Sequence, residues 1–178
     1  LSLHDARPIF AGSNAGHIYF GNFTVPLHLL VSDNSLSDTF SCNITFPVKE
    51  KIGSLQLFID SVDFYLIDRV THYLYSGKLS DLIAHPYISD TTWFSDAIPI
   101  SKTSFYIRTL NDKMHAYTLA KETAGSSHLK CSDTILQKQA DGFFSVDGML
   151  RFDRTLQKLI YIYYYRNQFI CMDTNLNL

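Results

Sequence analysis

The chain of 178 residues is poor in cysteine, in glycine and proline, and in charged side chains. Its three cysteines, Cys42, Cys131 and Cys171, lie too far apart in the sequence to predict a disulfide framework or a metal cluster. Eight glycines and five prolines are fewer than is usual, charged residues make up only 18% of the chain, and aromatic residues make up 14%. Such a chain can bury a core, which excludes wholesale disorder.

Two further classes of protein are excluded by charge and hydropathy. Fifteen Lys and Arg residues against 17 Asp and Glu residues give a net charge of −2, which offers no general means of neutralising phosphates. The longest apolar run, residues 159–165, is mostly tyrosine and is far shorter than the ~18 residues that a membrane helix needs. We therefore expect no nucleic-acid partner and no transmembrane segment in this sequence.

The first nine residues, Leu1-Ser-Leu-His-Asp-Ala-Arg-Pro-Ile9, differ in character from the rest of the chain. They contain neither an initiator Met nor the basic and apolar regions of a signal peptide. They resemble the translation of a common sequencing-adapter strand at every position except position 7. The adapter encodes Leu there, and one base change in that codon gives Arg7. The alternative is a polar loop that matches by chance. We interpret residues 1–9 as non-native and residues 10–178 as an incomplete domain.

A short segment of an apolar residue, Tyr and another apolar residue recurs four times along the chain. Each copy is followed by a polar turn and a second apolar stretch, and further short strand candidates lie before the copies and between them, whereas helical periodicity is nearly absent. Units of ~40–55 residues with four short strands are typical of β-propeller blades. The alternative to a propeller is an antiparallel β-sandwich. The four copies are Ile18-Tyr19-Phe20, Phe64-Tyr65-Leu66, Phe105-Tyr106-Ile107 and Ile160-Tyr161-Ile162.

We therefore predict an all-β fold, a partial β-propeller of about four repeats of four-stranded antiparallel blades. Strands at blade centres are covered on both faces and should be continuously apolar, as residues 64–67 and 159–165 are. The first unit is expected to lack its early strands, and the last unit stops after a third strand. Because propellers usually close with more units, we interpret the chain as a fragment of a longer protein. The repeats fall at 10–39, 40–85, 86–128 and 129–178.

Three segments resemble a group of uncharacterised β-propeller-like proteins of Bacteroidota. They are residues 141–153, residues 159–176 with the motif Tyr165-Arg-Asn-Gln-Phe169, and residues 19–30, which together make up well under half of the chain. The resemblance implies a propeller fold and a bacterial lineage. It also implies a location outside the cytoplasm, in the periplasm or at the outer membrane. It implies no role for any single residue.

Propeller topology predicts a binding face made of two kinds of loop. One kind enters the innermost strand of a blade, and the other joins its second and third strands. A ring of carboxylates, guanidiniums and amides on such a face, with Trp93 as a stacking platform, would suit a peptide, a sugar or a protein. The alternative is a solvated loop face, with Asp147 in a plain turn. The first kind of loop contributes Trp93, Asp96, Asp141 and Asp147, and the second contributes Arg69, Asn111, Arg166 and Asn167.

Two other arrangements of polar residues resemble metal sites, but we interpret both as structural and predict neither a metal nor a cofactor. His28, His72 and His115 open the same strand in three successive units, which places them too far apart to share a zinc ion. The segment 173–177 has oxygen ligands on alternate residues, but it lacks the glycine and the distal glutamate of a calcium loop. We interpret the histidines as polar residues at strand starts and the segment as a turn.

The leading functional hypothesis is a non-enzymatic binding or scaffold module of a bacterial cell envelope. The alternative is a propeller-fold hydrolase or lyase that acts on polysaccharide or peptide, with a carboxylate such as Asp147 as acid or base. Convergence of two carboxylates, or of a carboxylate and a histidine, in one pocket would favour the enzyme. A purely structural array of blades is a third possibility. The sequence leaves enzymatic activity open and favours binding.

Overall fold

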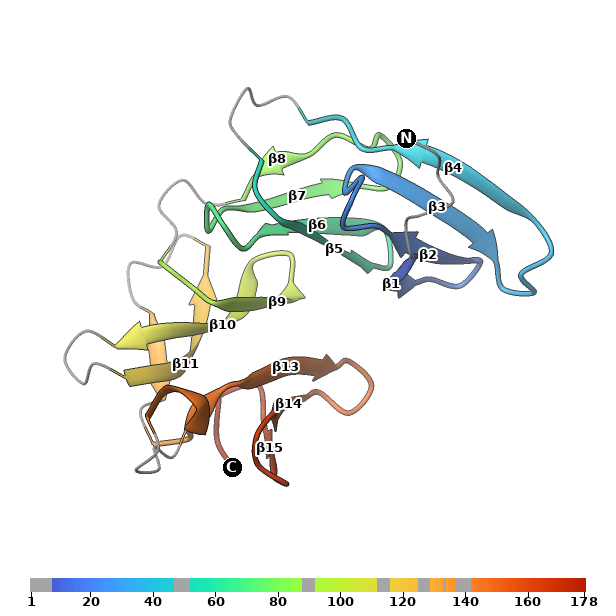
Figure 1. Cartoon of the computed structure of the whole chain (residues 1–178). Coiled ribbons are helices and arrows are strands. Elements are labelled where there is room, and N and C mark those ends of the chain that lie inside the picture. The colour runs from blue at the N-terminus through green and yellow to red at the C-terminus, as the bar shows by residue number, and fades with distance from the viewer. Residues whose placement is uncertain are drawn as a thin grey trace. The chain divides into compact units, whose positions relative to one another are not determined.

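Short β-strands contain most of the residues that the computed structural model describes. The structure describes residues 8–46, 52–87, 92–111, 116–124, 129–132, 134–136 and 142–178. The chain divides into two compact units, residues 1–91 and 92–178, and each is described here by itself. Each unit contains two antiparallel sheets (Figure 1).

Unit 1 consists of two four-stranded sheets whose strands follow one another in sequence order. All neighbouring strands pair antiparallel, as in the blades of a propeller. The first sheet contains β1 (Ile9–Ser13), β2 (His17–Gly21), β3 (His28–Asp33) and β4 (Thr39–Asn43). The second contains β5 (Leu55–Asp60), β6 (Asp63–Asp68), β7 (Leu74–Lys78) and β8 (His85–Pro86).

Unit 2 repeats the arrangement with one four-stranded and one three-stranded sheet. A short 3₁₀ helix, Gly142–Val146, precedes the second sheet, which begins two residues later. The first sheet contains β9 (Asp96–Ser101), β10 (Ser104–Asn111), β11 (Ala116–Thr123) and β12 (Lys130–Ser132). The second contains β13 (Gly148–Asp153), β14 (Lys158–Tyr163) and β15 (Phe169–Met172).

The predicted all-β fold of antiparallel blades is confirmed, with two differences in the first sheet. That sheet does not lack its early strand, because β1 pairs with β2 across a bulge between Phe10 and Gly12. After Phe10, the small residues Ala11, Gly12 and Ser13 give β1 no apolar alternation, which is why its sequence does not predict a strand. The sheet also continues past residue 39, since β4 pairs with β3 as far as Asn43.

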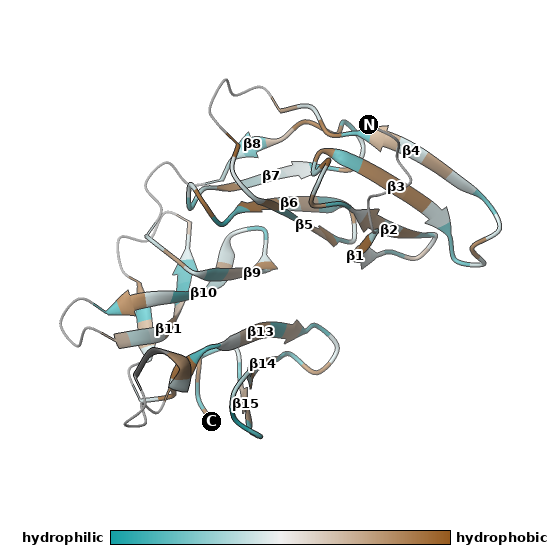
Figure 2. Ribbon diagram, in the orientation of Figure 1, coloured by the Kyte–Doolittle hydropathy of each residue, from teal (hydrophilic) through white to brown (hydrophobic). Residues whose placement is uncertain are grey.

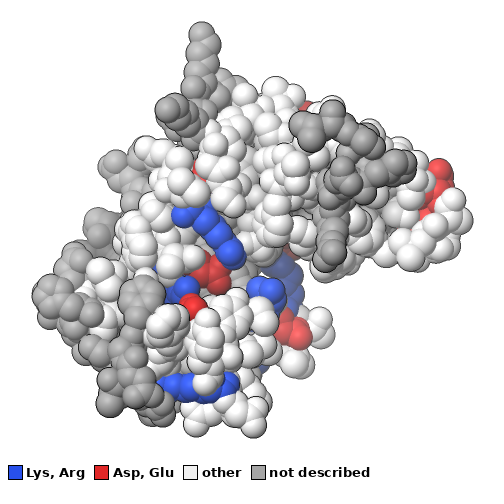
Figure 3. Space-filling view, viewed as in Figure 1, with Lys and Arg blue, Asp and Glu red and all other residues white. Residues whose placement is uncertain are grey.

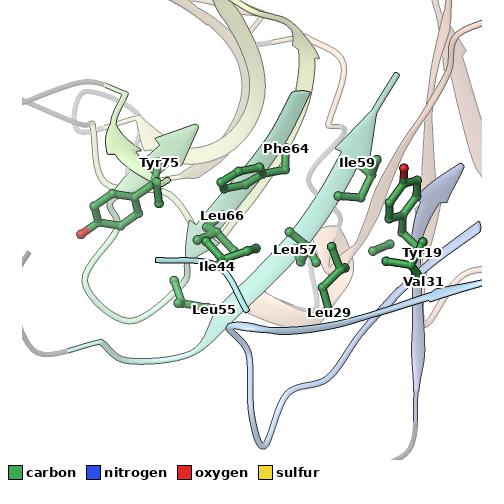
Figure 4. Packing of buried hydrophobic residues seen from close by; sticks show 12 residues of the cluster. Tyr19, Leu29, Val31, Ile44, Leu55, Leu57, Ile59, Phe64, Leu66 and Tyr75 are labelled. Atoms are coloured by element: carbon green, nitrogen blue, oxygen red, sulfur yellow. The ribbon is translucent and has the colours of Figure 1, made fainter. Parts of the chain in front are cut away.

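The core of unit 1 lies between its two sheets. Leu29 and Val31 of β3 pack with Leu57 and Ile59 of β5 in one buried cluster (Figure 4). Every second residue of β5 is buried, whereas β6 is buried along its whole length, as predicted for a strand covered on both faces. Figure 2 shows hydrophobic residues along both strands.

The core of unit 2 forms in the same way from β9, β10, β13 and β14. Leu159, Tyr161 and Tyr163 of β14 are buried, but the strand ends at Tyr163, so the apolar run 159–165 is a strand over only part of its length. Tyr164 and Tyr165 are exposed in the loop that follows. The repeated tyrosines are at most 6% exposed, so all four belong to the packed interior of their units: Tyr19, Tyr65, Tyr106 and Tyr161.

We expect Gly77→Ala to lower the free energy of unfolding of the chain by about 1–3 kcal/mol. A Cβ atom at Gly77 would lie 2.2 Å from the carbonyl oxygen of Ile83 and 2.3 Å from Cζ of Phe64. The control is Gly16→Ala, where a Cβ atom meets nothing within 4 Å, so we expect a change within ~0.5 kcal/mol. Denaturant unfolding measures both. Equal losses of stability in the two variants would contradict the close approach of Ile83 and Phe64 to Gly77.

Candidate functional site

The two kinds of loop predicted to form a binding face lie at the same end of each sheet. Alternation of antiparallel strands brings the start of the first strand next to the loop between the second and third strands. In unit 1, the backbone N–H of Arg69 donates to the carbonyl oxygen of Ser54 at 3.1 Å. In unit 2, the N–H of Tyr164 donates to the carbonyl oxygen of Asp147 at 3.0 Å. Hydrogen bonds therefore join the two loops directly in both units.

A buried guanidinium, that of Arg108 on β10, lies at the centre of the loop end of unit 2. Its Nη1 donates to Oδ1 of Asp147 at 2.8 Å, to the carbonyl oxygen of Gly148 at 3.0 Å and to the phenol oxygen of Tyr161 at 3.0 Å. Its Nε donates to Oγ of Ser95 at 2.7 Å. The side chain of Arg108 is 11% exposed and that of Asp147 is 30% exposed. We call these five residues the Arg108 network.

The electrostatics of the network hold Arg108 charged and Tyr161 neutral. Burial lowers the pKa of the Arg108 guanidinium, but the phenol oxygen of Tyr161 and the carboxylate of Asp147 outweigh it and raise the pKa overall. Burial raises the pKa of Tyr161 to about 12, against the opposing effect of Arg108. The Tyr161 hydroxyl therefore keeps its proton at neutral pH and donates it to the carbonyl oxygen of Val146.

Trp93, the predicted stacking platform, is partly covered by a second ring. It stacks on Tyr117 of β11 with ring centroids 6.2 Å apart and planes inclined by 26°. The guanidinium of Arg108 lies 5.3 Å from the centroid of the same Tyr117 ring. The indole is still 43% exposed, so it presents its remaining surface at the loop end of unit 2. Opposite charges lie next to one another around β9, β10 and β13 in Figure 3.

The other predicted site residues have different environments. Asp96 is buried, and its carboxylate accepts hydrogen bonds from the N–H groups of Ala97 and Leu150, so it joins β9 to β13. The guanidinium of Arg166 lies 4.8 Å from the centroid of the Tyr163 ring. Asn111 ends β10 half-buried, Asn167 is exposed in the β14–β15 loop, and Arg69 is exposed in unit 1. Asp141 lies outside the described residues.

Among the described residues, four aromatic side chains are exposed on the two kinds of loop in unit 2, and only one of them was predicted as a site residue. Phe144 and Tyr165 are 64% and 66% exposed and make an edge-to-face contact with centroids 5.5 Å apart. The run of tyrosines continues past the end of β14, and this feature of the sequence could have predicted Tyr164 and Tyr165. We call this set the loop aromatics, and it consists of Trp93, Phe144, Tyr164 and Tyr165.

In unit 1, a buried carboxylate fixes the corresponding loops. The oxygens of Asp68, the last residue of β6, accept the N–H groups of Gly53 at 2.7 Å, Ser54 at 3.1 Å, Val70 at 2.9 Å and Thr71 at 3.2 Å. Burial raises the pKa of this carboxyl, but the backbone donors, Gly53 first, lower it overall. Asp68 therefore joins the loop before β5 to the loop after β6.

The histidine and calcium-like segments have structural partners. Nδ1 of His28 lies 3.0 Å from Oδ1 of Asn43, His72 has a left-handed backbone with φ of 60°, and His115 lies outside the described residues. Oδ1 of Asp173 accepts the N–H groups of Asn175 and Asn177, which makes the segment a turn. Within the described ranges, no three His, Cys, Asp or Glu residues are grouped so that they could hold a metal ion. Over the same ranges, no helix is long and apolar enough to span a membrane.

Comparison with known proteins identifies the fold. No protein-family model and no curated protein matches the chain. Among solved structures, the chain is similar to the nidogen propeller in the crystal structure of a nidogen/laminin complex, with a TM-score of 0.58 and 12% sequence identity. The match covers 93% of this chain and 59% of the other. Likeness at this identity shows the fold alone, so the protein has a β-propeller fold and spans 59% of the matching chain.

We expect Arg108→Met to lower the free energy of unfolding by about 2 kcal/mol, because it leaves Asp147 and Tyr161 without their shared donor. Arg151→Met in the same unit is the matched control, because the Arg151 side chain is exposed and donates only to the carbonyl of Leu150. We expect that change to stay within ~0.5 kcal/mol. Thermal or denaturant unfolding separates the two, and equal losses would contradict a central role for Arg108.

We expect Asp68→Asn to lower the free energy of unfolding by about 1–2 kcal/mol at neutral pH, since charged acceptors form the stronger hydrogen bonds. Because folding lowers the pKa of Asp68, its contribution is present above the ordinary carboxyl pKa of about 4 and is lost as pH falls through the folded value. The difference in the free energy of unfolding between the unchanged chain and Asp68→Asn should therefore be full at pH 7 and shrink as pH falls below about 4. The exposed Asp81, with one hydrogen bond to the N–H of Ile83, is the control as Asp81→Asn. If the difference in the free energy of unfolding between the unchanged chain and Asp68→Asn did not change with pH, the assigned role of the charged Asp68 carboxylate would be contradicted.

Proposed function

We propose that the protein is a binding module that recognises a protein or peptide through the loop end of unit 2, with the loop aromatics as its contact surface. The observation that carries the proposal is the exposure of four large aromatic side chains on loops that the Arg108 network holds in place. Aromatic residues are enriched in protein interfaces, where they supply large apolar contact area at a small cost in side-chain entropy.

The rigidity of these loops supports binding. The carbonyl oxygen of Trp93 accepts a hydrogen bond from the Thr109 hydroxyl at 2.6 Å, and the N–H of Tyr164 is bound to Asp147. A surface that is ordered before it meets its partner loses less conformational entropy on binding. The arrangement favours a protein over a sugar, because one face of Trp93 is already covered by Tyr117.

The likeness to the nidogen propeller supports a protein partner by analogy of fold, since that propeller was solved in a nidogen/laminin complex. The hydrolase or lyase alternative has less support, because its acid or base, Asp147, is engaged by Arg108 and by the N–H of Gly148. We further propose that the module acts in the envelope of a bacterium, outside the cytoplasm. That part of the proposal rests on the resemblance of residues 141–153, 159–176 and 19–30 to proteins of Bacteroidota.

A peptide library displayed on phage and selected on the immobilised chain tests the proposal. We expect enriched peptides to lose at least about tenfold in affinity for Tyr165→Ala, because truncation of an aromatic anchor typically costs more than 1 kcal/mol. Leu156→Ala is the matched control, since Leu156 is equally exposed but lies in the β13–β14 turn at the other end of the sheet. We expect its affinity to be unchanged.

Oligosaccharides titrated into the same chain form the second arm of the experiment. Enrichment of no peptide, or peptides that bind both variants equally, would overturn the assignment of the loop aromatics. Binding of sugars alone would favour the alternative class of ligand.

A further inference from the structure

β15 is the outer strand of the second sheet of unit 2, and no described strand pairs with its outer edge. The other three sheets each have four strands, whereas the described residues of this sheet form three, in the order β13-β14-β15 (Figure 1). The edge of a sheet presents a row of backbone N–H and C=O groups that can pair with another extended chain. β15 therefore offers a place for one further strand.

The hydrogen-bond register of β15 decides which of its backbone groups face outward. β15 pairs antiparallel with β14 along its whole length. Directly before β15, the N–H of Tyr163 donates to the carbonyl oxygen of Gln168, its partner in the same register, at 3.2 Å. Bonded and non-bonded pairs alternate along an antiparallel ladder, so Ile170 is again bonded to β14. The N–H and C=O groups of Phe169 and Cys171 therefore point away from β14.

The second sheet of unit 1 contains an edge of the same kind with a fourth strand in place. Leu74 is the first residue of β7, the third strand of that sheet, as Phe169 is of β15. The carbonyl oxygen of Leu74 accepts a hydrogen bond from the N–H of Tyr87, directly after β8, at 2.8 Å. Two residues along β7, Ser76 lies opposite His85 of β8. A fourth strand thus bonds to the first and third residues of the strand beside it.

The side chains beside the open edge of β15 are apolar. Phe169 is 71% exposed, Cys171 is also exposed, and β15 contains no charged residue. Met172 belongs to the buried core of unit 2, and Ile170 packs against that core. Residues of a bonded pair have their side chains on the same face of a sheet. We therefore expect an added strand to place apolar side chains at alternate positions, next to Phe169 and Cys171.

We propose that an extended segment of the protein partner adds to this sheet as a strand antiparallel to β15, bonded to the backbone of Phe169 and Cys171. The inference rests on the proposed function in taking a protein as the partner, and it specifies how that partner binds. Only three residues separate Tyr165 from β15, namely Arg166, Asn167 and Gln168. A segment longer than β15 therefore continues from the sheet edge onto the loop aromatics.

A second copy of the chain is a poorer occupant of the same edge. Two β15 strands paired with each other would contribute only four residues each. Stable interfaces between proteins bury about 1,600 Å² in total, which is far more than two such short strands provide. A partner segment that also contacts the loop aromatics adds the area that a pair of β15 strands lacks.

Amide hydrogen exchange of the unchanged chain, followed by NMR, tests the register. In the free chain, we expect the N–H groups of Phe169 and Cys171 to exchange at least about tenfold faster than those of Ile170 and Met172, which bond to β14. A blocked heptapeptide, Thr-Val-Thr-Tyr-Thr-Val-Thr, should slow the exchange of Phe169 and Cys171 when it is titrated into the chain. This measurement does not depend on the folding of any variant.

Two N-methylated forms of the heptapeptide provide a matched control. The residues that bond to β15 are the alternate ones whose side chains lie beside Phe169, which are the valines and the tyrosine. Methylation of their backbone nitrogens removes the donors and should weaken binding at least about tenfold. Methylation of the same number of threonine nitrogens, which face away from β15, should leave the affinity within about twofold.

A pair of variants at one position tests the same hydrogen bonds from the side of the protein. Cys171→Pro removes an N–H that faces away from β14, and proline is tolerated at such edge positions, so we expect the fold to be retained. The variant should bind the heptapeptide at least about tenfold more weakly, because it lacks the donor. Cys171→Ala keeps the N–H and should bind the heptapeptide as the unchanged chain does.

Slow exchange of Phe169 and Cys171 in the free chain would overturn the partner segment as the occupant. If that protection were independent of concentration, the edge would be paired within the chain, and if it grew with concentration, a second copy would be the occupant. Equal effects of the two methylated peptides, or of Cys171→Pro and Cys171→Ala, would overturn strand addition, as would absence of heptapeptide binding.

These failures are distinguishable from failure of the proposed function. Each of them leaves the proposed function standing if peptides selected on phage still depend on Tyr165. Loss of that dependence, with the heptapeptide still bound through the backbone of Cys171, would overturn the loop aromatics and leave strand addition at β15 standing.

Discussion

The need to bury one tyrosine on the second strand of each sheet governs the structure. The ring is large enough to require a second sheet against it, and the phenol oxygen cannot be left unpaired in an apolar core without cost. In the first sheet, the hydroxyl of Tyr19 accepts a hydrogen bond from Nδ2 of Asn14 at 2.8 Å. In the fourth, Tyr161 binds Arg108 and the carbonyl oxygen of Val146. In these two sheets, packing and polar pairing depend on the same residue, whereas the buried hydroxyl of Tyr106 has no hydrogen-bond partner among the described residues.

The loop end of unit 2 follows from that pairing. Arg108 is buried because Tyr161, Asp147 and Gly148 together supply acceptors for its N–H groups, and a guanidinium is stable inside a protein only when it is paired in this way. The same contacts fix the approach to β13 and, through Tyr117, support Trp93. The network is therefore structural, and the exposed aromatic side chains around it are the groups that we propose contact a partner.

Unit 1 fixes its loops with the opposite charge. The carboxylate of Asp68 accepts four backbone N–H groups, so it serves both loops without any basic side chain. Its hydrogen bond to Gly53 also shapes one wall of the pocket that Phe23, Ile52 and Gly53 help to line. The two units thus share an architecture of loops but fix it differently: a carboxylate serves the loops of unit 1, and a guanidinium serves those of unit 2.

The sequence by itself determined the all-β class, the four repeated tyrosine segments and the two kinds of loop that lie at one end of the sheets, because hydrophobic periodicity and turn residues are local signals. It could not determine β1, whose small residues depend on pairing with β2, nor the end of β14, because a tyrosine run is apolar whether it is paired or exposed. Tertiary structure alone decided the roles of polar residues. Asp96 and Asp147 became structural partners, while Arg108, Asp68 and the pocket around Phe23 emerged from contacts between distant segments. A side chain's role depends on its neighbours in space, and those are set by how sheets pack.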